Sequence, residues 1–197
     1  MHSIVIPTII FATNNAHKVT EVRAVLGNKY QVLPLQEAGI LIDIPEPFNT
    51  LEANAHEKCR VIFELTGNNC FSEDTGLEVF ALNGEPGVIS ARYAGENRSA
   101  ADNMQKLLHN LKNVSNRKAQ FKTVISLIWN GEWHQFTGIC EGQIIDEPRG
   151  AAGFGYDPIF VPDGANKTFA EMNMDEKNEF SHRKKATQQL LHFLLKQ

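Results

Sequence analysis

Two adjacent carboxylates, Glu73 and Asp74, stand in the stretch SEDTGLEV, between an apolar run and a Thr75-Gly76 pair. Adjacent carboxylates are costly to bring together unless positive charge lies between them. Mg²⁺ bound to a triphosphate would supply that charge, since Mg²⁺ takes one or two carboxylates and completes its shell with phosphate oxygens and water. The alternative is an acidic surface turn in which Asp74 hydrogen-bonds its own backbone. The pattern predicts a strand, a turn at residues 72–76 and a second strand, with either reading open.

A second candidate site lies in IIFATNNAHK, where an apolar run ends in Thr13-Asn14-Asn15 and Lys18 follows. A helix that begins here would offer free N–H groups and partial positive charge to an anion. The stretch is not a Walker A loop, because it lacks the glycines and the G-K-[ST] ending. The alternative is that Asn14 or Asn15 caps the helix and that Lys18 is solvated.

The stretch GAAGFGYDPIF, residues 150–160, combines glycines with Phe154 and Tyr156. Glycine lets the backbone approach a ligand closely, and an exposed phenyl ring can stack on a flat ring. The alternative is a loop at a sheet edge whose aromatic side chains belong to the core. The pattern favours a site for a flat ring.

A basic cluster in EKNEFSHRKKA brings Lys177, His182 and Arg183 close to the start of the last predicted helix, with Ser181 as its cap. Positive side chains in a first helical turn are unfavourable with the helix dipole. We therefore expect an acidic or electron-rich group to compensate them, or an anion or carbonyl to bind there.

The elements that must position these residues alternate between strands and helices. Apolar runs of strand length, helical spacing of apolar residues and turn signals predict them. Strands are expected at residues 9–12 and 30–35, and two long strands within residues 120–145 are expected on either side of the Asn130-Gly131 turn. Helices are expected at residues 17–27, 50–67 and 97–111 and from about residue 181. Residues 84–95 are expected to form a loop. The last helix would be packed by Leu190, Leu191, Leu194 and Leu195. This order predicts a mixed α/β sheet flanked by helices, with ligands at the strand ends.

Composition limits the class of protein. The chain has 197 residues, 42% of them hydrophobic, and a formal net charge of −4, which favours one domain over residues 1–197 and argues against a nucleic-acid polymer as partner. Cys59, Cys70 and Cys140 form no metal-type pair, so free thiols in a reducing compartment are expected. The apolar N-terminal stretch is interrupted by Pro7 and is too short to cross a bilayer. We expect a cytoplasmic protein with no membrane partner.

In their order along the chain, TNNAHK, EDTGL, GEPGVISARYAG, GFGYDPIF and SHRKKA resemble the inosine triphosphate pyrophosphatase family, the XTP/dITP pyrophosphatases. The resemblance runs from about residue 9 to residue 195. It implies a homodimeric α/β fold with a long curved sheet and two lobes with a substrate cleft between them. It also implies Mg²⁺-dependent hydrolysis of ITP, dITP and XTP to the nucleoside monophosphate and pyrophosphate, which removes them from the nucleotide pool.

The resemblance assigns roles by position. Asp74 matches the proposed general base, and the magnesium ligands would be drawn from Glu46, Glu73 and Asp74. The substrate-binding residues would be Thr13, Asn14, Asn15, Ala16, His17 and Lys18 at the phosphates, Phe154, Gly155, Tyr156 and Asp157 at the base, and Lys58, Thr75, Lys177, His182 and Arg183 around them. Many members have Asp-Asp-Ser in place of Glu73-Asp74-Thr75, which keeps a carboxylate and a hydroxyl.

The hypothesis for the reaction is in-line attack of water on the α-phosphorus, with Asp74 taking its proton and lysines offsetting phosphate charge. Donors at His182 and Arg183 would favour a base with an oxygen at position 6. Two other readings are open at this point. One is a pyrophosphatase for a modified pyrimidine triphosphate, and the other is a nucleotide-binding regulator without turnover.

Overall fold

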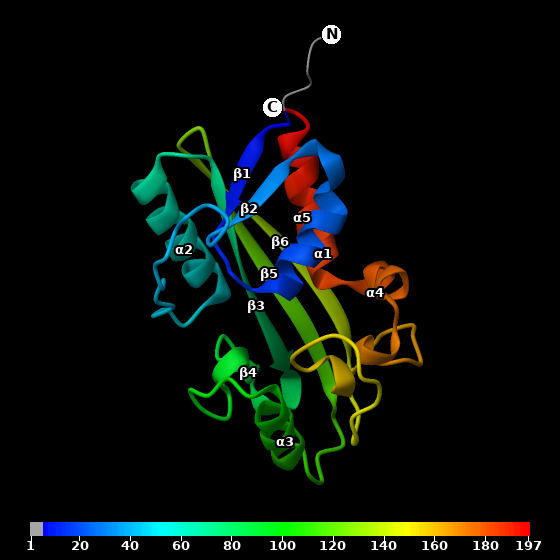
Figure 1. Ribbon diagram of the computed structural model, residues 1–197. Helices are drawn as coiled ribbons and strands as arrows, with labels where there is room; N and C mark the ends of the chain where they lie inside the picture. Colours follow the sequence, from blue (N-terminus) through cyan, green and yellow to red (C-terminus); the bar gives the residue numbers. More distant parts are fainter. Residues whose placement is uncertain (1–5) are drawn as a thin grey trace. The chain divides into compact units, whose positions relative to one another are not determined.

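A computed structural model describes residues 6–197; the first five residues, which begin the short segment ahead of the first strand, lie outside the described part. The strands are β1 Thr8–Phe11, β2 Gln31–Pro34, β3 Cys70–Val79, β4 Pro86–Gly87, β5 Lys118–Trp129, β6 Glu132–Ile144 and β7 Phe160–Pro162. The α-helices are α1 Ala16–Leu26, α2 Leu51–Thr66, α3 Ala100–Asn110, α4 Met174–Phe180 and α5 His182–Leu194 (Figure 1).

The strands form one mixed sheet in the order β2-β1-β3-β5-β6-β7, with β4 paired to β3. Strand β1 runs parallel to β2 and β3, whereas β4 and β7 pair antiparallel with their neighbours. The long strands β5 and β6 meet at Asn130 and Gly131, whose φ values of 51° and 83° fit a two-residue hairpin turn. The predicted mixed α/β sheet and its hairpin are confirmed.

The chain divides into two compact units. Unit 1 contains the residues up to Asp74 together with Val124–Thr137 and Arg183–Gln197, and unit 2 contains Thr75–Thr123 and Gly138–His182. Strands β3, β5 and β6 contribute residues to both units. Each unit has side chains of chemical interest, and each is described by itself below.

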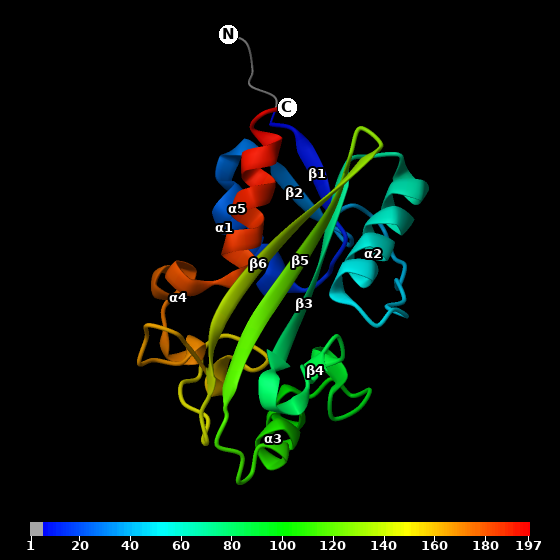
Figure 2. The same cartoon turned by 180° about the vertical axis from the view of Figure 1, so that it is seen from behind.

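Unit 1 has three layers because β1 sends alternate side chains to opposite faces of the sheet. Ile9 and Phe11 pack in the cluster that contains α1 and α5, whereas Ile10 and Ala12 pack in the cluster that contains α2. The two views in Figures 1 and 2 show α1 and α5 side by side and α2 across the sheet from them. The helical side chains in these clusters are Val19, Val22, Leu26, Ala186, Leu190 and Leu194 on one face and Cys59 and Ile62 on the other.

Helix α2 begins and ends as its sequence predicts. The Thr50 side chain caps it by accepting a hydrogen bond from the N–H of Ala53, and Gly67 ends it in the left-handed region at φ 65°. Helix α3 in unit 2 starts three residues later than the prediction, at Ala100. Arg98 has a φ of 52°, which no helix can include, and Ser99 supplies the cap.

The predicted last helix is confirmed as α5, which begins at His182, and Leu190, Leu191 and Leu194 pack in its cluster. Leu195 does not share that packing, because it lies beyond α5 and is 55% exposed. Helix α4, which ends just before Ser181, was not predicted. The turn predicted at residues 72–76 is also wrong. Residues 72–76 form no turn, because β3 runs unbroken from Cys70 to Val79. Gly76 serves a close approach instead: a Cβ there would lie 2.5 Å from the carbonyl oxygen of Gly87 on the paired strand β4.

Candidate functional site

The N-terminus of α1 is organised by the three polar residues that precede it. The Asn15 side chain accepts a hydrogen bond from the N–H of Lys18 at 3.2 Å, so the capping interpretation is confirmed for Asn15. Asn14 Oδ1 accepts from the N–H of Gln36 at 2.9 Å, and Thr13 Oγ1 accepts from the N–H of Asn15. These bonds fix the loop and leave the first turn of the helix, which includes the exposed Ala16 and His17, at the surface.

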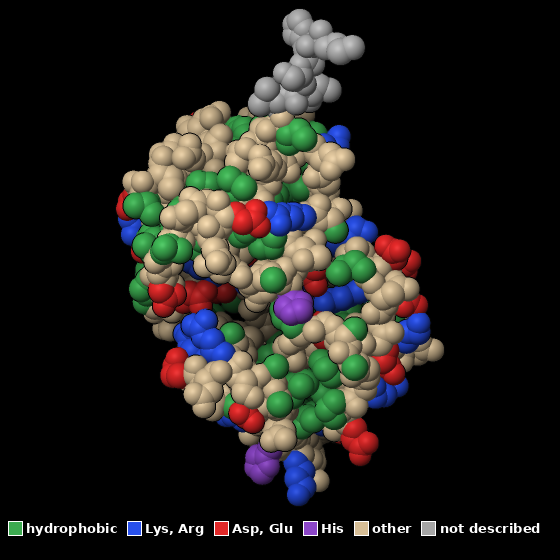
Figure 3. Space-filling model, viewed as in Figure 1, with side chains coloured by type: hydrophobic (Ala, Val, Ile, Leu, Met, Phe, Trp, Pro, Cys, Tyr) green, Lys and Arg blue, Asp and Glu red, His purple; other side chains and the backbone are tan. Residues whose placement is uncertain are grey.

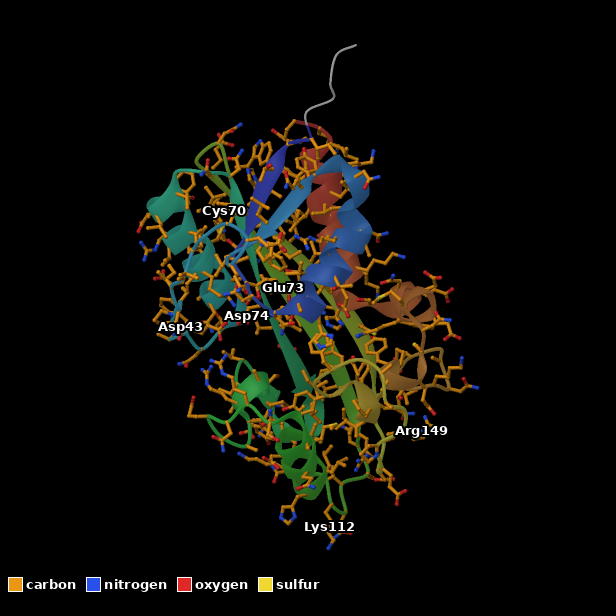
Figure 4. The ribbon with its side chains drawn as sticks, viewed as in Figure 1. Asp43, Cys70, Glu73, Asp74, Lys112 and Arg149 are labelled. Atoms are coloured by element: carbon orange, nitrogen blue, oxygen red, sulfur yellow. The ribbon has the colours of Figure 1, made fainter. Side chains whose placement is uncertain are left out.

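Glu73 is labelled on β3 in Figure 4. Its side chain is fully buried and pairs with two cations. Its Oε1 lies 3.1 Å from Lys18 Nζ and its Oε2 lies 2.8 Å from Arg183 Nε. Burial alone would raise the pKa of Glu73, but the charges of Arg183 and Lys18 outweigh it and hold that pKa well below its usual range. Lys18 is therefore paired and not solvated.

Arg183 is itself compensated by a second carboxylate. Its Nη1 lies 2.5 Å from Glu21 Oε2, and the side chain is almost fully buried. Burial would lower the pKa of Arg183, and Glu73 and Glu21 together raise it. We expected an acidic group to compensate the basic start of α5, and Arg183 has two such partners, Glu73 and Glu21. Glu21 was not predicted; its i, i+3 spacing from Lys18 was visible in the sequence, but its partner is 162 residues away.

Asp74 faces the other side of the sheet from Glu73, as neighbours in a strand must. Phe71 packs with α1 and α5, whereas Cys70 packs with α2 and Ser72 Oγ donates to Ala55 O of α2. The two carboxylates therefore point to opposite faces of β3, and the expectation that one ion is bound by both stays a prediction. Each carboxylate has its own cationic partners.

The partner of Asp74 is Lys58, which also contacts Glu46. Lys58 Nζ lies 3.3 Å from Asp74 Oδ1 and 2.5 Å from Glu46 Oε1. Burial raises the pKa of Asp74, and the charges of Lys58 and Lys18 offset this only in part. For Lys58, burial alone would lower the pKa, but Asp74 and Glu46 outweigh it and raise the value.

The loop that carries Glu46 is tied to α2 by Asn54, which is fully buried. Asn54 Oδ1 accepts from the N–H of Phe48, and Asn54 Nδ2 donates to Phe48 O at 3.0 Å. Asn54 and Lys58 share a helix face, as their i, i+4 spacing predicts. In the sequence that face had no feature that distinguished it from an ordinary polar surface.

The donor set suits a magnesium ion that is shared with phosphate and does not suit a closed protein cage. Residues 6–197 contain no group of three or more Asp, Glu, His or Cys side chains placed to hold a metal. Asp74 Oδ2 is a buried atom without a hydrogen-bond partner in the described part of the chain. Mg²⁺ commonly uses one or two carboxylates and takes its other ligands from phosphate and water. Asp74 and Glu46 fit this pattern, whereas both oxygens of Glu73 are already paired.

The second cluster, in unit 2, is built on the loop that carries Phe154. Asp157 is buried, and its Oδ2 accepts from the N–H of Phe154 at 2.9 Å and from Lys177 Nζ at 2.8 Å. Lys177 Nζ also lies 5.3 Å from the centre of the Phe154 ring. A Cβ on Gly153 would lie 2.2 Å from Asp157 Oδ2, so this glycine is required where it stands. Asp157 therefore shapes the loop around the phenyl ring.

Tyr156 and His182, two of the predicted site residues in this cluster, have side chains that pack in the interior of unit 2. The Tyr156 side chain is buried in the unit 2 core, and its hydroxyl donates to Ser90 O at 2.8 Å. The His182 ring stacks on Phe121 with 4.7 Å between the ring centres. Thr75 Oγ1 shares a hydrogen bond with Thr123 Oγ1 at 2.7 Å. Gly155, by contrast, has open space where a Cβ would point.

The structure separates the roles of His182 and Arg183, which are adjacent in the sequence. His182 belongs to the aromatic cluster of unit 2, and Arg183 Nε and Nη1 are committed to carboxylates in unit 1. Arg183 therefore has fewer donors for a base than the sequence suggested.

The first turn of α1 and the lysines that pair with the carboxylates of β3 offer partial and full positive charge, which suits an anion such as phosphate. Comparison with known sequences makes the class specific. A sequence profile of the Ham1 family matches residues 9–193, and this chain belongs to that family.

Relatives and solved structures agree over nearly the whole length. The dITP/XTP pyrophosphatase of Flavobacterium johnsoniae is 50% identical over 186 residues, 94% of this chain and 97% of the relative. The dITP/XTP pyrophosphatase of Porphyromonas gingivalis is 50% identical over 188 residues, 95% of this chain and 97% of the relative. The structure of the Staphylococcus aureus Ham1 protein is 40% identical and superposes with a TM-score of 0.88, over 96% of this chain and 98% of that chain.

Proposed function

We propose that this protein hydrolyses deaminated purine nucleoside triphosphates, dITP, XTP and ITP, to the nucleoside monophosphate and pyrophosphate, and so removes them from the nucleotide pool. The observation that carries the proposal is the buried pairing of Asp74 with Lys58, with Asp74 Oδ2 left without a partner. The full-length similarity to dITP/XTP pyrophosphatases supports the choice of substrate. The chain would work as a single functional domain over residues 1–197.

At the phosphate end, Asp74 would act as the general base. Burial raises the pKa of Asp74, which makes it a better proton acceptor than a solvated carboxylate, and its unpartnered Oδ2 could hold the attacking water. Asp74 and Glu46 would hold Mg²⁺, which, when bound, would neutralise phosphate charge. Lys18 and Lys58 would donate to phosphate oxygens. Thr13, Asn14, Asn15, Ala16 and His17 would present the helix N-terminus to the same oxygens.

At the base end, Phe154 would stack on the purine, and Gly155 would let the backbone come close to it. Lys177 and His182 would provide donors for the oxygen at position 6, where adenine has an amino group. Asp157 and Tyr156 would act through the loop that they hold, and Thr75 would contact the substrate beside Asp74. Glu73 and Arg183 would position Lys18. The resemblance made Glu73 a possible magnesium ligand and Arg183 a substrate-binding residue, and this proposal gives both an indirect role.

The ligand we propose is a small phosphorylated molecule. We also propose that the protein forms a homodimer and that it is located in the cytoplasm. Basic and acidic side chains are interspersed on the face drawn in Figure 3, and the net charge is −4, which does not favour a nucleic-acid polymer. Among residues 6–197, no helix combines the length and the apolar character that crossing a bilayer would require.

The test is release of pyrophosphate from ITP, XTP, dITP, GTP and ATP at equal enzyme concentration, with and without Mg²⁺. Release from the first three that is lost on chelation is the expected result. Equal rates on all five would keep the phosphate chemistry and remove the roles of Phe154, Lys177 and His182 in selecting the base. The same assay is run with dTTP and UTP, and faster pyrophosphate release from either would indicate a pyrimidine nucleotide as the substrate. Nucleotide binding without pyrophosphate release would indicate a regulator.

A further inference from the structure

Lys58 occupies the space between the two carboxylates that suit a divalent cation. Its ammonium nitrogen lies 2.5 Å from Glu46 Oε1 and 3.3 Å from Asp74 Oδ1. The side chains of Lys58 and Asp74 are each 9% exposed, so little water screens the contact. An ammonium group and Mg²⁺ satisfy carboxylate oxygens in mutually exclusive ways, because two cations at such distances repel each other strongly.

The position of Lys58 is fixed by the helix that carries it. Helix α2 is capped by Thr50, and Asn54, one turn before Lys58, holds the backbone of Phe48 in the loop that carries Glu46. The loop that carries Glu46 is therefore joined by hydrogen bonds to the helix that carries Lys58. Lys58 is presented to Glu46 and Asp74 by the fold and is not a side chain that happens to reach them.

The other lysine of unit 1 is placed differently. Lys18 contacts Glu73, but Glu73 also has Arg183 at 2.8 Å. Glu73 would thus stay paired if Lys18 turned toward a phosphate. Among residues 6–197, the cation that hydrogen-bonds to Asp74 is Lys58, so a move of Lys58 leaves a buried carboxylate without that partner.

We infer that Lys58 is a resident counter-ion that keeps divalent cations out of the Glu46–Asp74 pair until a triphosphate draws its ammonium group away. The inference rests on the proposed function, because it takes the pair as the magnesium site. Phosphate oxygens compete with the two carboxylates for Lys58, and the vacated carboxylates then require the metal. Binding of metal and of triphosphate are thereby coupled, each raising the affinity for the other.

The test is binding of Mn²⁺ to the nucleotide-free protein at constant pH, measured as loss of the free Mn²⁺ signal in electron paramagnetic resonance. The variant Lys58→Met is compared with the wild type and with Lys167→Met, which removes one positive charge from an exposed pair with Glu176. We expect Lys58→Met to bind Mn²⁺ at least about tenfold more tightly than the wild type, and Lys167→Met to match the wild type. Lys58→Gln serves as the second variant if Lys58→Met does not fold.

Equal or weaker Mn²⁺ binding by the Lys58 variants would overturn the inference. A measurement without variants adds to this: Mg²⁺ alone should leave the Tm of the wild type unchanged, and a clear rise of Tm with Mg²⁺ alone would also overturn it. Failure of the proposed function is distinct, since it appears as absence of pyrophosphate release from every triphosphate. Tighter Mn²⁺ binding by Lys58→Met would stand in that case as evidence for metal exclusion.

Discussion

The substitution Arg183→Met tests the buried charge network of unit 1. It removes the guanidinium that lies 2.8 Å from Glu73 Oε2 and 2.5 Å from Glu21 Oε2 and replaces it with an apolar side chain. Glu73 is then left with Lys18, and Glu21 loses the cation that it faces. The carboxylates stay buried, because β3 and α1 hold them there.

The expected loss of stability in Arg183→Met follows from the burial of the ion pairs that it breaks. Removing one partner of a buried ion pair costs about 3–5 kcal/mol of stability, because the remaining charge keeps its desolvation penalty without compensation. For a chain of this size, 1 kcal/mol corresponds to about 2–4 °C in Tm, so we expect Arg183→Met to lower Tm by about 6–20 °C. The partial compensation of Glu73 by Lys18 places the result toward the lower end.

Thermal unfolding followed by circular dichroism measures this, and Arg60→Met is the matched control. Arg60 also pairs with two carboxylates, those of Glu57 and Glu64, but on the surface of α2, where solvent screens the charges. The same chemical change at Arg60 should leave Tm nearly unaltered. Equal shifts for the two variants would refute the reasoning, because burial would then not decide the cost.

The pH dependence gives a second check on the same network. The pKa of Glu73 is lowered in the folded protein, so its pairing contributes stability above the unfolded value of about 4.5, and this is lost as pH falls below that value. The difference in stability between the wild type and Arg183→Met should therefore be largest near neutral pH and shrink below about pH 4. A difference that stays constant down to low pH would point to lost packing and not to lost charge pairing.

Further substitutions test the two clusters and the cap of helix α2. Asp74→Asn should abolish pyrophosphate release while leaving nucleotide binding largely intact, because it removes the proposed base and keeps the size of the side chain; an active, well-folded variant would contradict this. Gly153→Ala should raise KM for dITP and lower Tm, because the added Cβ would lie 2.2 Å from Asp157 Oδ2. Gly155→Ala is the control: its Cβ would enter open space, so it should have a smaller effect on Tm. Thr50→Ala should cost about 1 kcal/mol in a denaturant titration through loss of the α2 cap, and an unchanged midpoint would argue against that cap.

Local signals in the sequence were sufficient for most of the elements. Helix α2 lies between a threonine cap and a left-handed glycine, and the β5–β6 hairpin turns at Asn130 and Gly131. These features depend on residues within a few positions of one another, so the sequence contains the information directly. Arg98 shows the limit: nothing local announced its positive φ, and the start of α3 was placed three residues too early.

The turn predicted at residues 72–76 failed for a tertiary reason. Ser72, Glu73 and Asp74 are polar, and polar residues followed by Thr-Gly are typical of turns. In the fold each of the three has a partner from a distant segment: Ala55 O for Ser72, Lys18 and Arg183 for Glu73, and Lys58 for Asp74. A strand can bury such residues only when those partners are supplied, and the sequence does not say that they are.

By itself, the sequence determined the types of side chain present and the helices that carry Lys18 and Lys58. It placed the two carboxylates in a turn, whereas they lie within the strand β3. Only the tertiary structure decided which cation meets which carboxylate. The period of two residues in β3 sends Glu73 and Asp74 to opposite faces, so Glu73 enters a buried network with Arg183 and Asp74 is left to Lys58 and Glu46. Electrostatic pairing of this kind depends on distances between segments up to 162 residues apart, which no spacing along the chain encodes.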